Sequence, residues 1–96
     1  MAISVTYHHG LTKGQRKEWR RKGFATAVLY GKGIETRQLL VPVREVIHRI
    51  VEQGGKQKAV LELTDGSGQP LRVRVKEIQR HLTTQEPIHF DFAVVS

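Results

Sequence analysis

The sequence predicts a small, mainly β domain, a mostly antiparallel barrel or sandwich with two helices. Its length of 96 residues favours a single domain over residues 1–96. Segments in which apolar and polar residues alternate outnumber segments with helical spacing. The predicted order β-α-β-β-α-β-β-β also lacks the regular strand–helix alternation of a doubly wound parallel sheet.

The first half of the chain is predicted to hold three strands and a short helix. Apolar and polar residues alternate over residues 3–7, as in a half-buried strand. Residues 13–22 are expected to form a helix that Gly23 ends. Residues 25–30 and 38–41 are predicted strands, and a Gly-Lys-Gly turn signal follows the first of them.

A second helix is predicted after Pro42 from the spacing of five apolar residues. These are Val43, Val46, Ile47, Ile50 and Val51. They form one stripe of an amphipathic helix, which we expect to pack against a sheet. Pro42 lies near the first turn, where its missing N–H costs no hydrogen bond, and Gly54-Gly55 ends the helix.

The second half of the chain is predicted to be antiparallel sheet. Residues 58–64, 71–75 and 88–94 have the composition and alternation of strands. The alternation that starts at Leu71 breaks because the next apolar residue after position 75 is three positions on. This break predicts a bulge or a strand end that turns Gln79 towards the polar side.

The charge balance predicts a polyanionic partner. Sixteen Lys and Arg against nine Asp and Glu give a net charge of +7, and cysteine is absent. Absence of cysteine removes disulfides and thiol chemistry and is compatible with a reducing cytoplasm. No segment has the pattern of a secretion signal or the ~20 apolar residues of a membrane span, so we expect a cytoplasmic protein.

Most of the excess charge lies in one segment, residues 13–22, which we call the basic segment. It holds Lys13, Arg16, Lys17, Arg20, Arg21, Lys22 and the single acid Glu18. The segment carries +5, and the other 86 residues share +2. Because ten residues are fewer than the ~12–15 of a marginal isolated helix, we expect a helix that a polyanion orders. The alternative is a solvated surface face.

Catalytic and metal sites are not indicated. His89 and Asp91 would share one face of a strand, but a site needs further ligands or a nucleophile, and none is evident. No phosphate-binding glycine loop occurs either. We therefore predict no enzyme, no metal and no cofactor. The roles of two aromatic residues stay open: Trp19 either anchors its helix or stacks on a base, and Tyr30 either caps the core or contacts RNA.

Three segments together resemble one family. They are AVLYGKG at residues 27–33, VKEIQRH at residues 75–81 and IHFDF at residues 88–92. In this order they resemble the bacterial 5S-rRNA-binding proteins of the large ribosomal subunit, the twenty-fifth in its numbering, which include general stress protein Ctc. The resemblance implies a six-stranded, mostly antiparallel barrel with two or three helices, in the short single-domain form. It also implies binding to an irregular stretch of 5S rRNA through a widened minor groove by a protein that is monomeric when free.

The resemblance also implies RNA-facing residues. Carried over by position, they are His8, Lys17, Arg20, Tyr30, Gln79, His89 and Asp91. The basic segment adds Lys13, Arg16 and Arg21 as expected phosphate contacts, which give affinity and register without sequence information. Gln79, His89 and Asp91 are the better candidates for base edges or 2′-hydroxyls. Because phosphates repel a carboxylate, we expect Asp91 to accept from a base or to orient a neighbouring basic side chain.

The sequence departs from the family pattern at several of these positions. Relatives usually have proline at Thr26 and Leu82, arginine at His8 and Lys17, and serine at Arg16. The main hypothesis is a non-catalytic ribosomal protein that binds 5S rRNA. The departures leave an alternative, a stress-associated paralogue that uses the same fold as a general RNA-binding or regulatory module.

Overall fold

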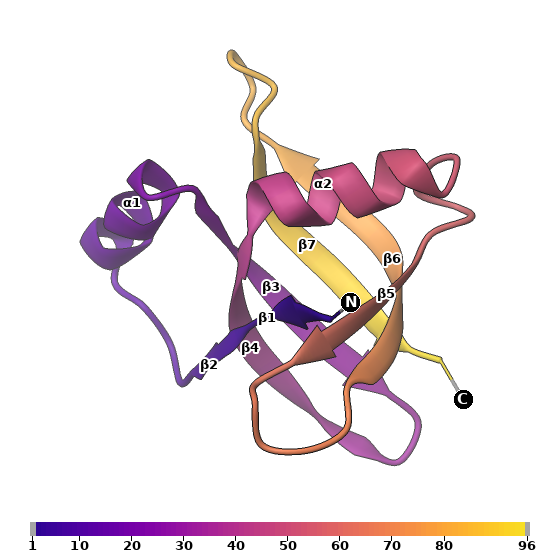
Figure 1. Cartoon of the computed structure of the whole chain (residues 1–96). Helices are drawn as coiled ribbons and strands as arrows, with labels where there is room; N and C mark the ends of the chain where they lie inside the picture. Colours follow the sequence, from indigo (N-terminus) through magenta and orange to yellow (C-terminus); the bar gives the residue numbers. More distant parts are fainter. Residues whose placement is uncertain (1, 96) are drawn as a thin grey trace.

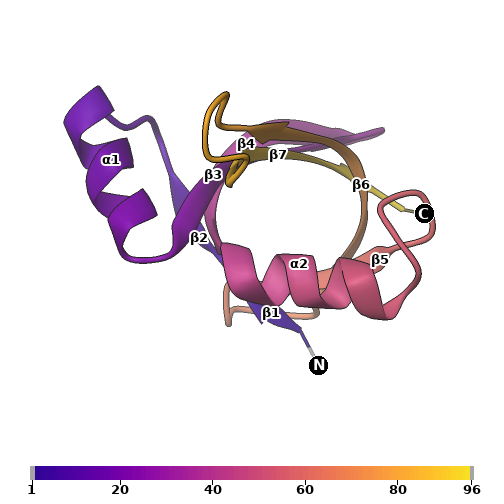
Figure 2. The same cartoon turned by 90° about the horizontal axis from the view of Figure 1, so that it is seen from above.

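The computed structural model describes residues 2–95, whose seven strands form one mixed sheet curved into a nearly closed barrel (Figure 1, Figure 2). The strands are β1 (Ile3–Ser4), β2 (Thr6–His8), β3 (Phe24–Gly31), β4 (Ile34–Pro42), β5 (Val60–Thr64), β6 (Leu71–Arg80) and β7 (Pro87–Val94). The helices are α1 (Lys13–Arg21) and α2 (Val43–Glu52). The strand order in the sheet is β1-β5-β6-β7-β3-β4-β2.

The N-terminal segment joins the two edges of this sheet. β1 pairs with β5 in parallel, and β2 pairs with β4 antiparallel. Only Val5 separates the two strands, and its N–H donates to the carbonyl of Thr64 at 2.8 Å. The side chain of Val5 is 8 % exposed and belongs to the core. A single segment of chain therefore pairs with both edges of the sheet.

The prediction of a mainly β fold with two helices is confirmed, but the prediction of six mostly antiparallel strands is wrong in detail. Residues 3–7 were expected to form one strand and instead form parts of two. Alternation of buried and exposed residues continues through Val5, so the pattern does not reveal the change of partner. Two strand pairs are parallel, β1 with β5 and β3 with β7. An alternation pattern does not show whether two segments far apart in the sequence pair in parallel or antiparallel.

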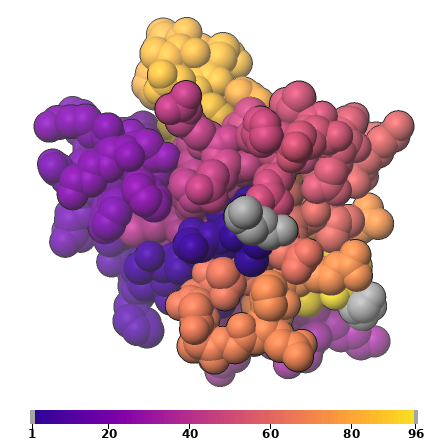
Figure 3. Space-filling view, in the orientation of Figure 1, coloured from indigo at the N-terminus to yellow at the C-terminus, as the bar shows by residue number. Residues whose placement is uncertain are grey.

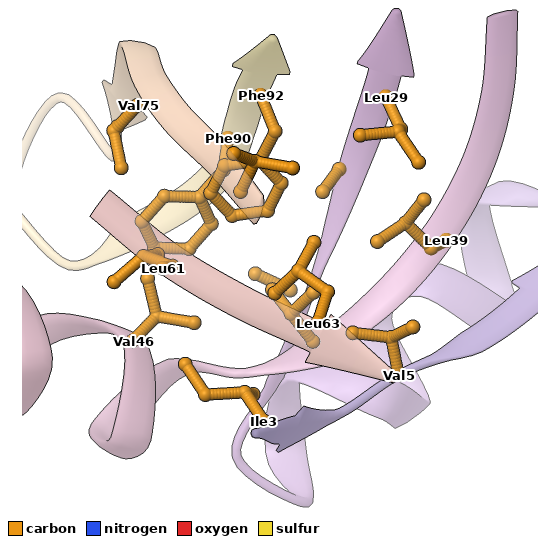
Figure 4. Packing of buried hydrophobic residues seen from close by; sticks show 14 of the residues in the cluster. Ile3, Val5, Leu29, Leu39, Val46, Leu61, Leu63, Val75, Phe90 and Phe92 are labelled. Carbon is orange, nitrogen blue, oxygen red and sulfur yellow. The ribbon is translucent and has the colours of Figure 1, made fainter. Parts of the chain in front are cut away.

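The core fills the inside of the barrel with buried apolar side chains from every strand except β2, whose partly buried Tyr7 packs against it (Figure 4). Phe90 and Phe92 of β7 are fully buried, with near-parallel rings whose centroids lie 5.7 Å apart. The predicted stripe of α2 buries Val46 and Ile50 against the same core. Burying each such side chain contributes about 1.5–3 kcal/mol, so these residues hold α2 on the barrel.

The predicted irregularity in β6 is a bulge. The register between β6 and β7 shifts between Val75 and Glu77. Beyond the shift, Glu77 lies opposite Asp91, and Gln79 lies opposite His89. The extra residue reverses the alternation, and Gln79 is exposed as predicted.

Helix α1 lies outside the barrel as a separate arm (Figure 1, Figure 2). A capping box starts it: the Gln15 N–H donates to Thr12 Oγ1 at 3.1 Å, and the Thr12 N–H donates to Gln15 Oε1 at 3.0 Å. Gly23 follows with a φ of +92°. No α1 residue is buried, so the structure agrees with an exposed basic helix. That a polyanion orders it stays a prediction. In residues 2–95, neither helix is long and apolar enough to cross a membrane.

Candidate nucleic-acid interface

The outer face of the sheet carries two rows of side chains that cross neighbouring strands. The strand register aligns Gln79, His89, Thr26, Leu40 and Thr6 in the first row. It aligns Glu77, Asp91, Val28, Gln38 and His8 in the second row. Neighbouring strands lie about 4.8 Å apart, so each row is a continuous band of mostly polar groups.

A groove of about 450 Å³ lies between this face and α1, and we call it the sheet-side groove. Its lining includes Lys13, Arg16 and Arg20 from α1 and His8, Gln79 and His89 from the sheet. Leu40 lies on its floor, 2 % exposed and outside the core cluster. The fold therefore brings together six of the ten residues that the sequence predicted as RNA-binding.

His89 is held in place through both ring nitrogens. Its Nε2 lies 3.1 Å from Oδ1 of Asp91, and its Nδ1 lies 2.8 Å from Oγ1 of Thr26. The Thr26 hydroxyl oxygen also lies 3.4 Å from the carbonyl oxygen of Ile88. Asp91 does not line the groove itself, and its contact with the groove runs through the imidazole that it orients. This matches one of the two roles that the sequence left open for Asp91.

His8 is the other histidine of the groove, and its environment favours the neutral ring. Its Nδ1 accepts from the N–H of Gly10 at 3.0 Å, and its buried Nε2 has no hydrogen-bond partner within residues 2–95. Burial lowers the pKa of His8 below its ordinary value of 6.5; the Leu39 main chain opposes this shift and the neighbouring His9 reinforces it. A second proton on the ring would remove the acceptor that Gly10 uses.

This arrangement predicts an acid sensitivity that depends on His8. Because the folded state lowers the pKa, the unfolded chain takes up the proton more readily, and stability falls as the pH drops below about 6.5. His8→Asn keeps an acceptor for Gly10 without the titrating ring. We expect urea denaturation to show a smaller loss of stability between pH 7 and pH 5 in this variant than in the wild type. An equal loss in both proteins would contradict the assignment.

The other residues singled out from the sequence divide between the sheet-side groove and other parts of the surface. Trp19 packs edge-on against Phe24 with ring centroids 5.2 Å apart, which supports its role as the anchor of α1, and it also lines the groove. Tyr30 lies half-buried on β3, opposite Ala93 and outside the groove. Lys17 and Arg21 line a different groove on the other flank of α1.

Three residues that form or position the site were not predicted from the sequence. Thr12 starts α1, and the pattern Thr-x-x-Gln was the available signal for it. Gln38 lies next to His8 in the second row, and its place in a predicted strand was the signal for it. Thr26 had no local signal, because its partner His89 is 63 positions away.

The histidine and acidic side chains described around the groove do not form a cluster of three. Within residues 2–95, no group of three or more His, Cys, Asp or Glu side chains could hold a metal ion. His89 and Asp91 are a hydrogen-bonded pair rather than part of a ligand set. What the groove offers is cationic groups on one wall and polar, mostly neutral groups on the other.

Comparisons with known proteins agree with one another. The model of the Ribosomal L25p family matches residues 3–92. The chain is 30% identical over 93 residues to large ribosomal subunit protein bL25 of Syntrophotalea carbinolica, covering 97% of this chain and 45% of that protein. It is 40% identical over 84 residues to the bL25 protein of Carboxydothermus hydrogenoformans, covering 88% of this chain and 40% of that protein. The chain spans less than half the length of these curated relatives.

Proposed function

Because this chain belongs to the Ribosomal L25p family, we propose that it is a structural protein of the large ribosomal subunit that binds 5S rRNA. In this proposal residues 1–96 form one RNA-binding domain and act in the cytoplasm as part of the ribosome. The relatives it resembles carry the name of large-subunit proteins, which supports the ribosomal role. The identity of the RNA rests on the resemblance described above.

The sheet-side groove is the observation that carries the proposal. Lys13, Arg16 and Arg20 provide positive charge on one wall, where phosphates would be favoured. Gln79 provides a hydrogen-bonding amide on the other wall, where base edges or 2′-hydroxyls would be read, and His89 provides a fixed ring surface beside it. In this arrangement the α1 wall would supply most of the binding affinity, and the sheet wall would distinguish one RNA from another.

The sheet wall has free hydrogen-bonding capacity. The side chain of Gln79 forms no hydrogen bond within residues 2–95, so its amide can both donate and accept. The Asp91 carboxylate contacts His89 through Oδ1, and its second oxygen, outside the lining of the groove, can accept from a base amino or imino group that lies beyond the His89 ring. Because His89 uses both ring nitrogens within the protein, its contribution to RNA would come from a fixed ring surface.

Binding to purified 5S rRNA over a range of salt concentrations tests this function. We expect tight binding in which log K falls with log salt by about 0.7–0.9 per phosphate neutralised. An unrelated structured RNA of the same length is the control, and co-purification with large subunits at moderate salt is the second readout. A nearly flat salt dependence would contradict the proposal, and equal affinity for both RNAs would favour the general RNA-binding alternative.

Asp91→Ala is expected to reduce the preference for 5S rRNA. Loss of the carboxylate frees the His89 ring and removes an acceptor for base donors, so 5S rRNA should lose about 1–3 kcal/mol relative to the control RNA. Glu62→Ala removes an equal charge from an exposed position of β5, outside both rows, and serves as the matched variant. The assignment is wrong if Asp91→Ala changes the affinity for both RNAs equally.

A further inference from the structure

A second groove lies on the other flank of α1, and we call it the helix-side groove. It has a volume of about 470 Å³ and lies between α1, the start of α2 and the segment between β6 and β7. Figure 3 shows these three parts meeting, with α1 in violet, α2 in magenta and residues 81–86 in yellow-orange. Four cationic side chains line it, Lys17, Arg20, Arg21 and Arg44. The last of these comes from α2, outside the basic segment.

The cations of the helix-side groove are not neutralised by the protein. Within residues 2–95, none of the four forms an ion pair. Glu86 is the acidic residue in the lining. Glu18 lines neither groove, because it lies one position after Lys17 and is turned by about 100° around the helix. The groove therefore keeps a net positive charge.

The apolar part of the helix-side groove narrows the choice of occupant. Phe24, Val43, Pro87 and Ile88 add apolar side chains to the lining of the groove beside the cations. A small anion alone would leave these side chains uncovered. A nucleotide of an RNA strand has both parts, because its sugar and base can cover apolar surface while its phosphate meets the cationic rim.

We propose that the helix-side groove binds the phosphodiester backbone of a second RNA strand, with Arg44 as a phosphate contact. The proposal rests on the proposed function, since it assumes that a first strand occupies the sheet-side groove. Arg20 lines both grooves, and α1 with its side chains is about 10–12 Å across. The helix would thus lie between two strands of one RNA, each strand held by a different set of cations.

Arg44→Ala tests the new contact, with Arg72→Ala as the matched control. Arg72 is an exposed arginine of β6, opposite Glu62 and far along the sheet from both grooves. We expect Arg44→Ala to weaken 5S rRNA binding several-fold and to lower the salt slope by about 1, with an unchanged melting temperature. Equal behaviour of the two variants would overturn the inference while the proposed function stands. A wild-type protein that does not bind 5S rRNA would instead contradict the proposed function itself.

Site-directed cleavage tests the two-strand arrangement. The chain contains no cysteine, so a single introduced cysteine can carry an iron chelate that cuts nearby RNA. Leu11→Cys places the chelate at the sheet-side groove, and Glu86→Cys places it at the helix-side groove, without loss of a cation. We expect the two positions to cut opposite strands of the same RNA helix. Cuts on a single strand, or cuts from position 11 alone, would overturn the inference.

Discussion

Replacing Val5 by aspartate is expected to leave the protein largely unfolded. Val5 lies where the N-terminal segment changes partner between the two edges of the sheet, and its side chain is packed into the core. An uncompensated buried charge costs about 3–5 kcal/mol, and the buried valine contributes about 1.5–3 kcal/mol that is also lost. The combined loss of about 4.5–8 kcal/mol compares with a stability of about 5–15 kcal/mol for a domain of this size, and it removes most or all of the stability at the lower end of that range.

Thr6→Asp is the matched control for this prediction, and thermal melting followed by circular dichroism is the measurement. Thr6 is the next residue along the chain and is exposed on the outer face. The same new charge there should change stability by no more than about 1 kcal/mol. If Val5→Asp melts as the control does, closure of the barrel by residues 3–8 does not limit its stability.

The fold shows which information a single sequence holds. Alternation predicted the strands, helical spacing predicted α2, and a break in alternation predicted the bulge that exposes Gln79. These are local patterns, because each depends only on residues that are close together in the sequence. The change of partner at Val5 and the parallel pairing of β3 with β7 involve segments far apart in the sequence, and no local pattern records them.

The candidate site also combines contacts that local spacing predicts with contacts that depend on tertiary structure. A spacing of two on one strand placed His89 and Asp91 on one face, and the contact of 3.1 Å between them follows from that spacing. Thr26 reaches His89 only because β3 pairs with β7, and Arg44 joins α1 only because α2 starts beside the end of that helix. The N–H of Val43 donates to the carbonyl of Gly23 at 3.0 Å, which fixes this approach. Such contacts depend on tertiary structure, so the composition of the basic segment could not indicate them.

Arg20→Ala is expected to cause the largest loss of RNA affinity of any single substitution in α1. Arg20 lines both grooves, whereas Lys13 and Arg16 line one and Lys17 and Arg21 line the other. Its guanidinium can therefore contact phosphates of either strand, and a hydrogen bond to a charged group contributes about 1.5–3 kcal/mol. Affinity should fall by a factor of about 10–100 for 5S rRNA and for an unrelated RNA alike, because phosphate contacts do not read sequence.

Lys22→Ala separates this local effect from net charge. Lys22 follows α1 directly, carries the same charge and lines neither groove, and its ammonium lies 5.1 Å from the centroid of the Trp19 ring. Dissociation constants for both variants at two salt concentrations decide between the explanations. If the position of the charge determines its effect, the dependence of affinity on salt concentration falls clearly for Arg20→Ala and little for Lys22→Ala. Equal losses would mean that α1 attracts RNA only through its total charge, and the two grooves would then have no distinct roles.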